Sequence, residues 1–132
     1  MNTFKRRNKT VSLLNYHFVF CPRYRRKIFL NHAVEEFFKK QTKEVCDQLG
    51  IDIISMECDV DHVHLFVQSV PTLSPSDIMA KIKGTTSRAI RKEFEHLNHL
   101  PSVWTRSYFV STAGNMSSET IKRYVEEQKT RG

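Results

Sequence analysis

The segment from residue 59 to residue 67 carries His62 and His64 separated by one residue, and it constrains the fold more than any other part of the chain. Its apolar, β-branched composition is typical of a β-strand. Because side chains alternate between the two faces of a strand, His62 and His64 point to the same side, about 7 Å apart along the chain. The opposite face is expected to pack into a core through Val63, Leu65 and Val67. Two imidazoles on one rigid face can bind a metal ion, but a pair of neutral histidines on a half-exposed sheet is the ordinary alternative.

A second candidate site lies near the C-terminus, in residues 117–128. Ser117 or Ser118 can cap a helix there. The spacing i, i+3, i+4, i+7 places four residues on one helical stripe: Ile121, Tyr124, Val125 and Gln128. Ile121 and Val125 would pack the helix against the rest of the protein, while the Tyr124 phenol and the Gln128 amide face the same surface. Taken alone, this stripe favours an ordinary core tyrosine, and only the histidine pair makes a functional tyrosine the stronger interpretation.

The order of elements predicts an α+β fold of the ferredoxin-like or RRM-like βαββαβ type, with an extra C-terminal helix that carries the tyrosine. Two helices would cover one face of an antiparallel sheet and leave the histidine face for function. The first half of the chain is expected to hold a strand at 13–21, a helix from Asn31 to Leu49 stopped by Gly50, and strands at 51–57 and 62–67 joined by a turn at 59–61. A loop at 71–75 then leads to a helix from Ser74 or Ser76 to Phe94. A connection at 96–106, a strand at 107–112 and a turn at Gly114 and Asn115 follow. The expected buried sides are Val34, Phe37, Phe38, Val45 and Leu49 on the first helix and Ile78, Ile82, Ala89 and Ile90 on the second.

The chain of 132 residues is expected to form one domain, 1–132, with residues 1–10 as a flexible basic arm. Its net charge of +7 predicts a polyanionic partner, with a merely solvated basic surface as the alternative. The cations gather in three groups, of which the second surrounds an aromatic residue, Tyr24. Aromatic rings among cations can stack on bases while the cations hold phosphates. The predicted DNA-binding residues are Arg6, Arg7, Arg23, Arg25, Arg26, Lys83 and Arg88.

Several functional classes are not expected. Cys21, Cys46 and Cys58 are too scattered for a zinc knuckle and indicate reduced thiols in a cytoplasmic protein. No stretch approaches the roughly 20 apolar residues of a transmembrane helix. None of the four glycines builds a phosphate-binding loop, so no nucleotide cofactor is expected.

Taken together, five segments resemble the TnpA-type single-tyrosine HUH transposases, which move insertion sequences as single-stranded DNA. The segments are Tyr16–Lys27, Asp61–Leu65, Lys83–Arg88, Trp104–Val110 and Tyr124–Gln128. In this family HUH denotes His, a bulky apolar residue and His, which correspond here to His62, Val63 and His64. The nucleophilic tyrosine of the family precedes a glutamine by four residues, which matches Tyr124 and Gln128. The acidic residues Asp59 and Asp61 precede the histidines, and the sequence alone assigns them no role.

The resemblance implies a metal-dependent endonuclease and strand transferase in which Tyr124 attacks a phosphodiester, giving a 5′-phosphotyrosine and a free 3′-hydroxyl. It implies that His62, His64 and Gln128 hold a divalent cation, Mg²⁺ or Mn²⁺, of which the two imidazoles favour Mn²⁺. It also implies homodimers that bind single-stranded DNA hairpins at the ends of the element. Two alternatives stay open: a non-catalytic RRM-like nucleic-acid-binding protein, such as a domesticated transposase, and an HUH replication or mobilisation initiator nuclease.

Overall fold

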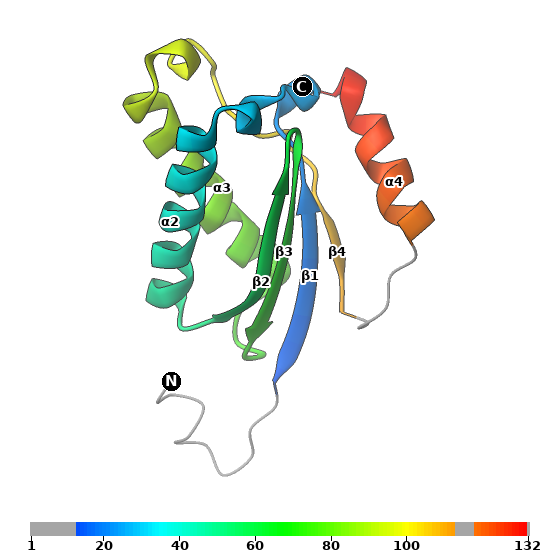
Figure 1. Ribbon diagram of the computed structural model, residues 1–132. Helices are drawn as coiled ribbons and strands as arrows, with labels where there is room; N and C mark the ends of the chain where they lie inside the picture. The colour runs from blue at the N-terminus through cyan, green and yellow to red at the C-terminus, as the bar shows by residue number, and fades with distance from the viewer. Residues whose placement is uncertain (1–12, 113–117, 132) are drawn as a thin grey trace.

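The computed structural model describes residues 13–112 and 118–131, and these residues form a four-stranded antiparallel sheet with helices on both faces (Figure 1). The strands lie in the order β2-β3-β1-β4, which places β1 and β3 at the centre. Their bounds are Leu14–Phe20 for β1, Asp52–Asp59 for β2, His62–Ser69 for β3 and Phe109–Ser111 for β4. This confirms the predicted βαββαβ order and the α+β class, because the two helices that follow β1 and β3 complete the pattern.

Those two helices, α2 (His32–Leu49) and α3 (Pro75–Glu93), lie side by side on one face of the sheet (Figure 1). The predicted boundaries of α2 are confirmed, because the Asn31 side chain accepts a hydrogen bond from the backbone N–H of Ala33 and Gly50 ends the helix with φ 71°. Ser74 caps α3 by accepting from the backbone N–H of Asp77 at 3.1 Å. The caps therefore define where each helix begins or ends.

The core lies between these helices and the sheet face that the alternation predicted. The predicted inward residues of β3 are completely buried: Val63, Leu65 and Val67. Trp104 is also buried and packs edge-on against Phe20 with ring centroids 5.0 Å apart. The expected buried side of α3 needs one correction, because Ala89 is only partly buried while Met79 is fully buried.

The C-terminal helix α4 (Ser118–Glu127) lies on the opposite face of the sheet from α2 and α3 (Figure 1). Val125 packs there against Val19 and Cys21 in a small second core. A 3₁₀ turn, η4 (Gln128–Thr130), continues the helix. The last strand is shorter than expected, since β4 covers only three residues of the predicted 107–112. The expected basic arm at 1–10 and the turn at Gly114 and Asn115 lie outside the described residues.

Candidate active site

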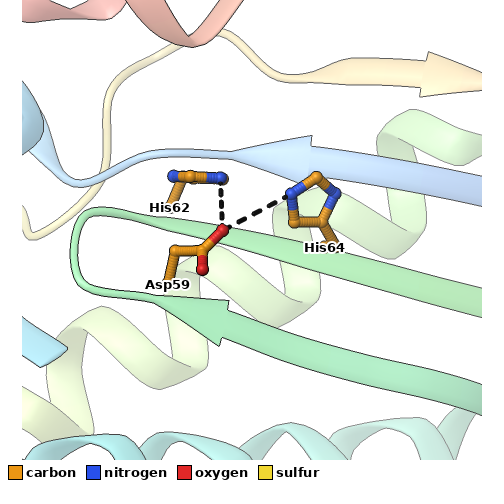
Figure 2. A group of neighbouring side chains, drawn as sticks. All are labelled: Asp59, His62 and His64. Carbon is orange, nitrogen blue, oxygen red and sulfur yellow. Dashed lines mark ion pairs between the residues drawn. The ribbon is translucent and has the colours of Figure 1, made fainter. Parts of the chain in front are cut away.

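The two histidines of β3 lie on the sheet face opposite the main core, as the alternation predicted. Asp59, at the end of β2, is the register partner of His62 and completes a group of three possible metal ligands (Figure 2). One Asp59 carboxylate oxygen lies 2.8 Å from His62 Nε2 and 3.9 Å from His64 Nε2. The ligand atoms of the three residues all lie within 4.8 Å of one another, so this group could hold one metal ion. The ligand set therefore includes an oxygen donor to which the sequence had assigned no role.

His64 has a third histidine, His17, as its neighbour across the β1–β3 pair. Its Nδ1 lies 3.4 Å from His17 Nε2, and the two rings are 5.6 Å apart between centroids. Burial lowers the pKa of His64, and the neighbouring His62 and His17 lower it further. Burial also lowers the pKa of His17. Since a metal binds the neutral form of imidazole, this environment keeps His64 in the form that a metal requires.

A second carboxylate, Asp61, holds the other side of the His62 ring. Asp61 Oδ1 lies 2.9 Å from His62 Nδ1, and two guanidinium nitrogens of Arg25 contact Oδ2 at 2.7 and 2.9 Å. Burial by itself would raise the pKa of Asp61, but the hydrogen bonds from His62 and Arg25 outweigh it and lower the pKa. Asp61 is therefore an ionised group with partners on both oxygens.

The tyrosine predicted as the nucleophile lies on the same sheet face as the histidines, because α4 packs there. The ring of Tyr124 packs edge-on against Phe109, whose register partner on β1 is Val19. Val19 in turn is the register partner of His64. Burial is the main cause that raises the pKa of Tyr124. Tyr124 is therefore a neutral phenol in this arrangement.

Ser107 joins Tyr124 to Gln128 through a directional chain of hydrogen bonds. Gln128 Nε2 donates to the backbone carbonyl of Tyr124 at 3.2 Å, so its Oε1 is the atom that faces Ser107. The Ser107 hydroxyl donates to that oxygen at 3.1 Å. A hydroxyl has only one hydrogen, so its other contact, 3.2 Å to the Tyr124 hydroxyl, must be one in which Tyr124 donates. Sequence reasoning did not single out Ser107, which it placed at the start of the strand expected at 107–112, whereas in the structure Ser107 lies in the irregular connection before β4.

Gln128, predicted as the third metal ligand, is almost completely buried in η4. Its side-chain hydrogen bonds go to Ser107 and to the Tyr124 carbonyl, and within the described residues none reaches His62 or His64. The structure thus brings Tyr124 and Gln128 together in one group and His62 and His64 together in another. A role for Gln128 as a ligand stays a prediction.

The predicted DNA-binding residues occupy different environments. Arg23 donates to the Trp104 carbonyl, and the Arg26 guanidinium lies 5.4 Å above the Tyr24 ring, which is 55% exposed. Lys83 Nζ donates to two backbone carbonyls, and burial lowers its pKa to about 8. Arg25 is paired with Asp61 as described above, and Arg88 is exposed on α3. The remaining two, Arg6 and Arg7, lie outside the described residues.

Among the described residues, no helix is both long enough and apolar enough to cross a membrane.

Comparison with known proteins gives a consistent result. A protein-family model described as "Transposase IS200 like" matches residues 10–128. The chain is 32% identical over 123 residues to the transposase for insertion sequence element IS200 of Salmonella typhimurium, covering 86% of this chain and 78% of the relative. It is 27% identical over 118 residues to the ISDra2 transposase TnpA of Deinococcus radiodurans, covering 87% and 84% respectively.

Solved structures share the fold. A crystal structure from Deinococcus radiodurans R1 superposes with a TM-score of 0.82 at 26% identity, over 92% of this chain and 95% of that chain. A REP-associated tyrosine transposase bound to a REP hairpin superposes with a TM-score of 0.61 at 14% identity, over 90% of this chain and 67% of that chain.

Proposed function

This chain belongs to the IS200-like transposase family, and we propose that it acts in DNA transposition by cleaving and rejoining single-stranded DNA through a 5′-phosphotyrosine at Tyr124. One observation carries this proposal. The helix that bears Tyr124 packs on the same sheet face that presents the Asp59, His62 and His64 group. A nucleophile and a metal-ligand group on one open face is the arrangement that metal-assisted phosphoryl transfer requires.

In this proposal His62, His64 and Asp59, whose ligand atoms lie together in this structure, hold a divalent cation. The Gln128 amide oxygen, which accepts a hydrogen bond from Ser107 in this structure, is the further ligand that we propose. A bound divalent cation supplies charge neutralisation and polarisation of the scissile phosphate. Imidazole nitrogens together with carboxylate and amide oxygens suit Mn²⁺ and are compatible with Mg²⁺. The donor set therefore fits the cofactor that the family resemblance implied.

Tyr124 begins the reaction with its proton in place. A free tyrosine with a pKa near 10 is ionised in only about one molecule in a thousand at pH 7, a deficit of roughly 4 kcal/mol. The surroundings in this structure raise its pKa further, and its hydroxyl donates to Ser107. In the reaction the Tyr124 oxygen bonds to phosphorus as the bond from phosphorus to the 3′-oxygen breaks. Tyr124 gives up its phenolic proton and the leaving 3′-oxygen takes up a proton, so the products are the 5′-phosphotyrosine and a free 3′-hydroxyl. Rejoining reverses this exchange at a new 3′-hydroxyl, so no nucleotide cofactor is consumed.

The substrate in this proposal is a single-stranded DNA hairpin at each end of the element, bound in the cytoplasm by a homodimer. The hairpin-bound REP-associated tyrosine transposase, which shares the fold, supports this choice. The net charge of +7 supports a polyanionic ligand. The exposed ring of Tyr24, with Arg26 over it, offers a surface on which a base could stack.

The test is a denaturing gel of the full chain incubated with single-stranded DNA from both flanks of its gene and Mn²⁺. We expect a metal-dependent covalent protein–DNA band that is absent in Tyr124→Phe and retained in the matched control Tyr24→Phe. A band that persists in Tyr124→Phe would assign the nucleophile elsewhere. Hairpin binding without any band would support the non-catalytic alternative, and nicking at a replication origin would support the initiator nuclease.

A further inference from the structure

The turn after β1 has an unusual backbone that directs Arg25 inward. Tyr24 and Arg25 have φ values of 57° and 51°, and they are the only non-glycine residues with positive φ in the part of the chain described. Side chains with a Cβ adopt this left-handed region at an energetic cost, and such strain persists only where surrounding contacts fix it. Here the Tyr24 N–H donates to the Arg131 carbonyl at 2.7 Å and the Arg25 N–H to the Pro22 carbonyl at 2.9 Å.

The strained turn places the Arg25 guanidinium against Asp61 and largely out of solvent. Its Nη2 and Nε lie 2.7 and 2.9 Å from the same carboxylate oxygen, Oδ2. The side chains are 16% and 8% exposed. Exposed ion pairs contribute little, whereas a shielded pair fixes both partners firmly, because removing either one leaves a buried charge unpaired. This pair is therefore a rigid element next to the histidine group.

The second oxygen of Asp61 contacts His62. Oδ1 lies 2.9 Å from His62 Nδ1. A carboxylate can only accept, so Nδ1 must carry the hydrogen of this bond. The other ring nitrogen, Nε2, points toward Asp59. With Nδ1 committed to Asp61, Nε2 is the nitrogen of His62 that can bind a metal.

We propose that Asp61 and Arg25 form a positioning pair that holds His62 with Nδ1 protonated and Nε2 directed at the metal site. Metal-binding histidines commonly donate their second N–H to a carboxylate, and loss of that partner weakens metal binding by about 10- to 100-fold. Arg25 thus forms an ion pair with Asp61 within the protein, although the sequence predicted it as a DNA-binding residue. The inference rests on the proposed metal site at His62 and His64.

Arg25 has one further contact, which supplies a matched control. Its Nη1 lies 3.5 Å from Glu126 Oε1 on α4, but Glu126 is 52% exposed and pairs more closely with Lys129 at 2.9 Å. Glu126→Gln removes one carboxylate charge beside Arg25 and leaves Asp61 untouched. We expect that variant to keep wild-type metal affinity.

The experiment is a calorimetric titration of the metal-free full chain with MnCl₂, for the wild type, Asp61→Asn, Arg25→Lys, Glu126→Gln and His64→Ala. We expect Asp61→Asn to bind Mn²⁺ at least 10-fold more weakly than the wild type. Arg25→Lys keeps the charge but loses the two-nitrogen contact, so we expect a smaller loss. A second readout is the ¹⁵N NMR shift of His62 Nδ1 in the metal-free protein, which reports the hydrogen bond of this nitrogen to Asp61 and should differ between the wild type and Asp61→Asn.

The outcomes separate this inference from the function on which it rests. If Asp61→Asn matches the wild type while His64→Ala loses binding, the metal site stands and the positioning pair is overturned. If His64→Ala also matches the wild type, the proposed metal site itself fails. Melting curves identify any variant that does not fold. If Asp61→Asn is one of them, Arg25→Lys provides the comparison, and a wild-type metal affinity together with a wild-type Nδ1 shift would overturn the inference.

Discussion

The phenolic oxygen of Tyr124 lies 3.2 Å from the hydroxyl oxygen of Ser107, and the direction of this hydrogen bond is fixed by its surroundings. Because Ser107 donates its own hydrogen to Gln128, it accepts the hydrogen of Tyr124. The proposed nucleophile and the proposed amide ligand are thereby held by one serine. In the proposed reaction Tyr124 and Gln128 therefore either leave Ser107 or continue to share it when DNA and metal bind.

We predict that Ser107→Ala slows formation of the covalent complex at neutral pH. The Ser107 hydroxyl can turn to donate to the phenolic oxygen as it ionises, which lowers the pKa of Tyr124 against the opposing effect of burial, so loss of Ser107 raises that pKa. The variant also leaves the buried Gln128 oxygen without its donor, at a cost of about 1–3 kcal/mol in the free energy of unfolding. The measurement is the pH profile of covalent-complex formation, which should shift to higher pH. Ser107→Thr, which keeps a hydroxyl, should stay close to the wild type.

We predict that Lys83 contributes to stability and not to the salt dependence of DNA binding. Its ammonium group donates to the carbonyls of Thr105 and Ser107, on the segment that holds Tyr124. Lys83→Met should therefore destabilise the fold yet leave the slope of log K against log salt unchanged. Arg88→Gln, an exposed cation on the same helix, should reduce that slope by about 0.7 if Arg88 contacts one phosphate of a single strand. A reduced slope for Lys83→Met would restore Lys83 to the DNA-binding residues predicted from the sequence.

Local patterns account for what the sequence predicted correctly. The alternation of β3 determines which residues enter the core, and His62 and His64 share a face as a direct result. The helix boundaries at Asn31 and Gly50 follow from side-chain capping and from a left-handed φ, which are properties of a few adjacent residues. The element order then led to the correct fold class, because few arrangements bury two helices on one face of four strands.

Contacts between distant segments account for what the sequence did not reveal. His17 lies beside His64 only because β1 pairs with β3, a register that no local pattern contains. The pairing of Arg25 with Asp61 depends on a left-handed turn at Tyr24, where no glycine marks the conformation. The contact of Ser107 with Tyr124 depends on the path of an irregular connection.

We predict that the aromatic ring of Tyr24 contributes to single-stranded DNA binding. The ring is 55% exposed, and the Arg26 guanidinium lies 5.4 Å from its centroid, so a base stacking there would meet a cation as well. Tyr24→Ala should weaken binding by about 1–3 kcal/mol, the usual contribution of one base–aromatic stack. Fluorescence anisotropy with a labelled hairpin measures this loss. Tyr24→Phe keeps the ring and should bind like the wild type, and equal affinities for all three proteins would contradict the prediction.

We predict that stability falls in alkaline solution partly through Cys46. Burial raises the pKa of this thiol from 9.0 to about 12. Above pH 9 the unfolded chain releases the thiol proton while the folded chain keeps it, so the folded state loses stability as pH rises toward 12. At pH 10.5 the loss from this group is on the order of 2 kcal/mol. Urea unfolding of the wild type and Cys46→Ala between pH 8 and 10.5 should show the difference between them shrinking as pH rises, whereas a constant difference would exclude the effect.

We predict that Asp59 is a metal ligand and not a structural residue. One of its oxygens lies 2.8 Å from His62 Nε2 and 3.9 Å from His64 Nε2, while its side chain is 63% exposed (Figure 2). Asp59→Asn should therefore weaken Mn²⁺ binding by about tenfold, since it removes the anionic oxygen, and change the metal-free melting temperature little. Glu57→Gln is the matched control, because Glu57 lies on the same strand, is exposed and is the register partner of His64. If both substitutions weaken Mn²⁺ binding equally, Asp59 acts only through its charge; if only Asp59→Asn does, the oxygen belongs to the metal site.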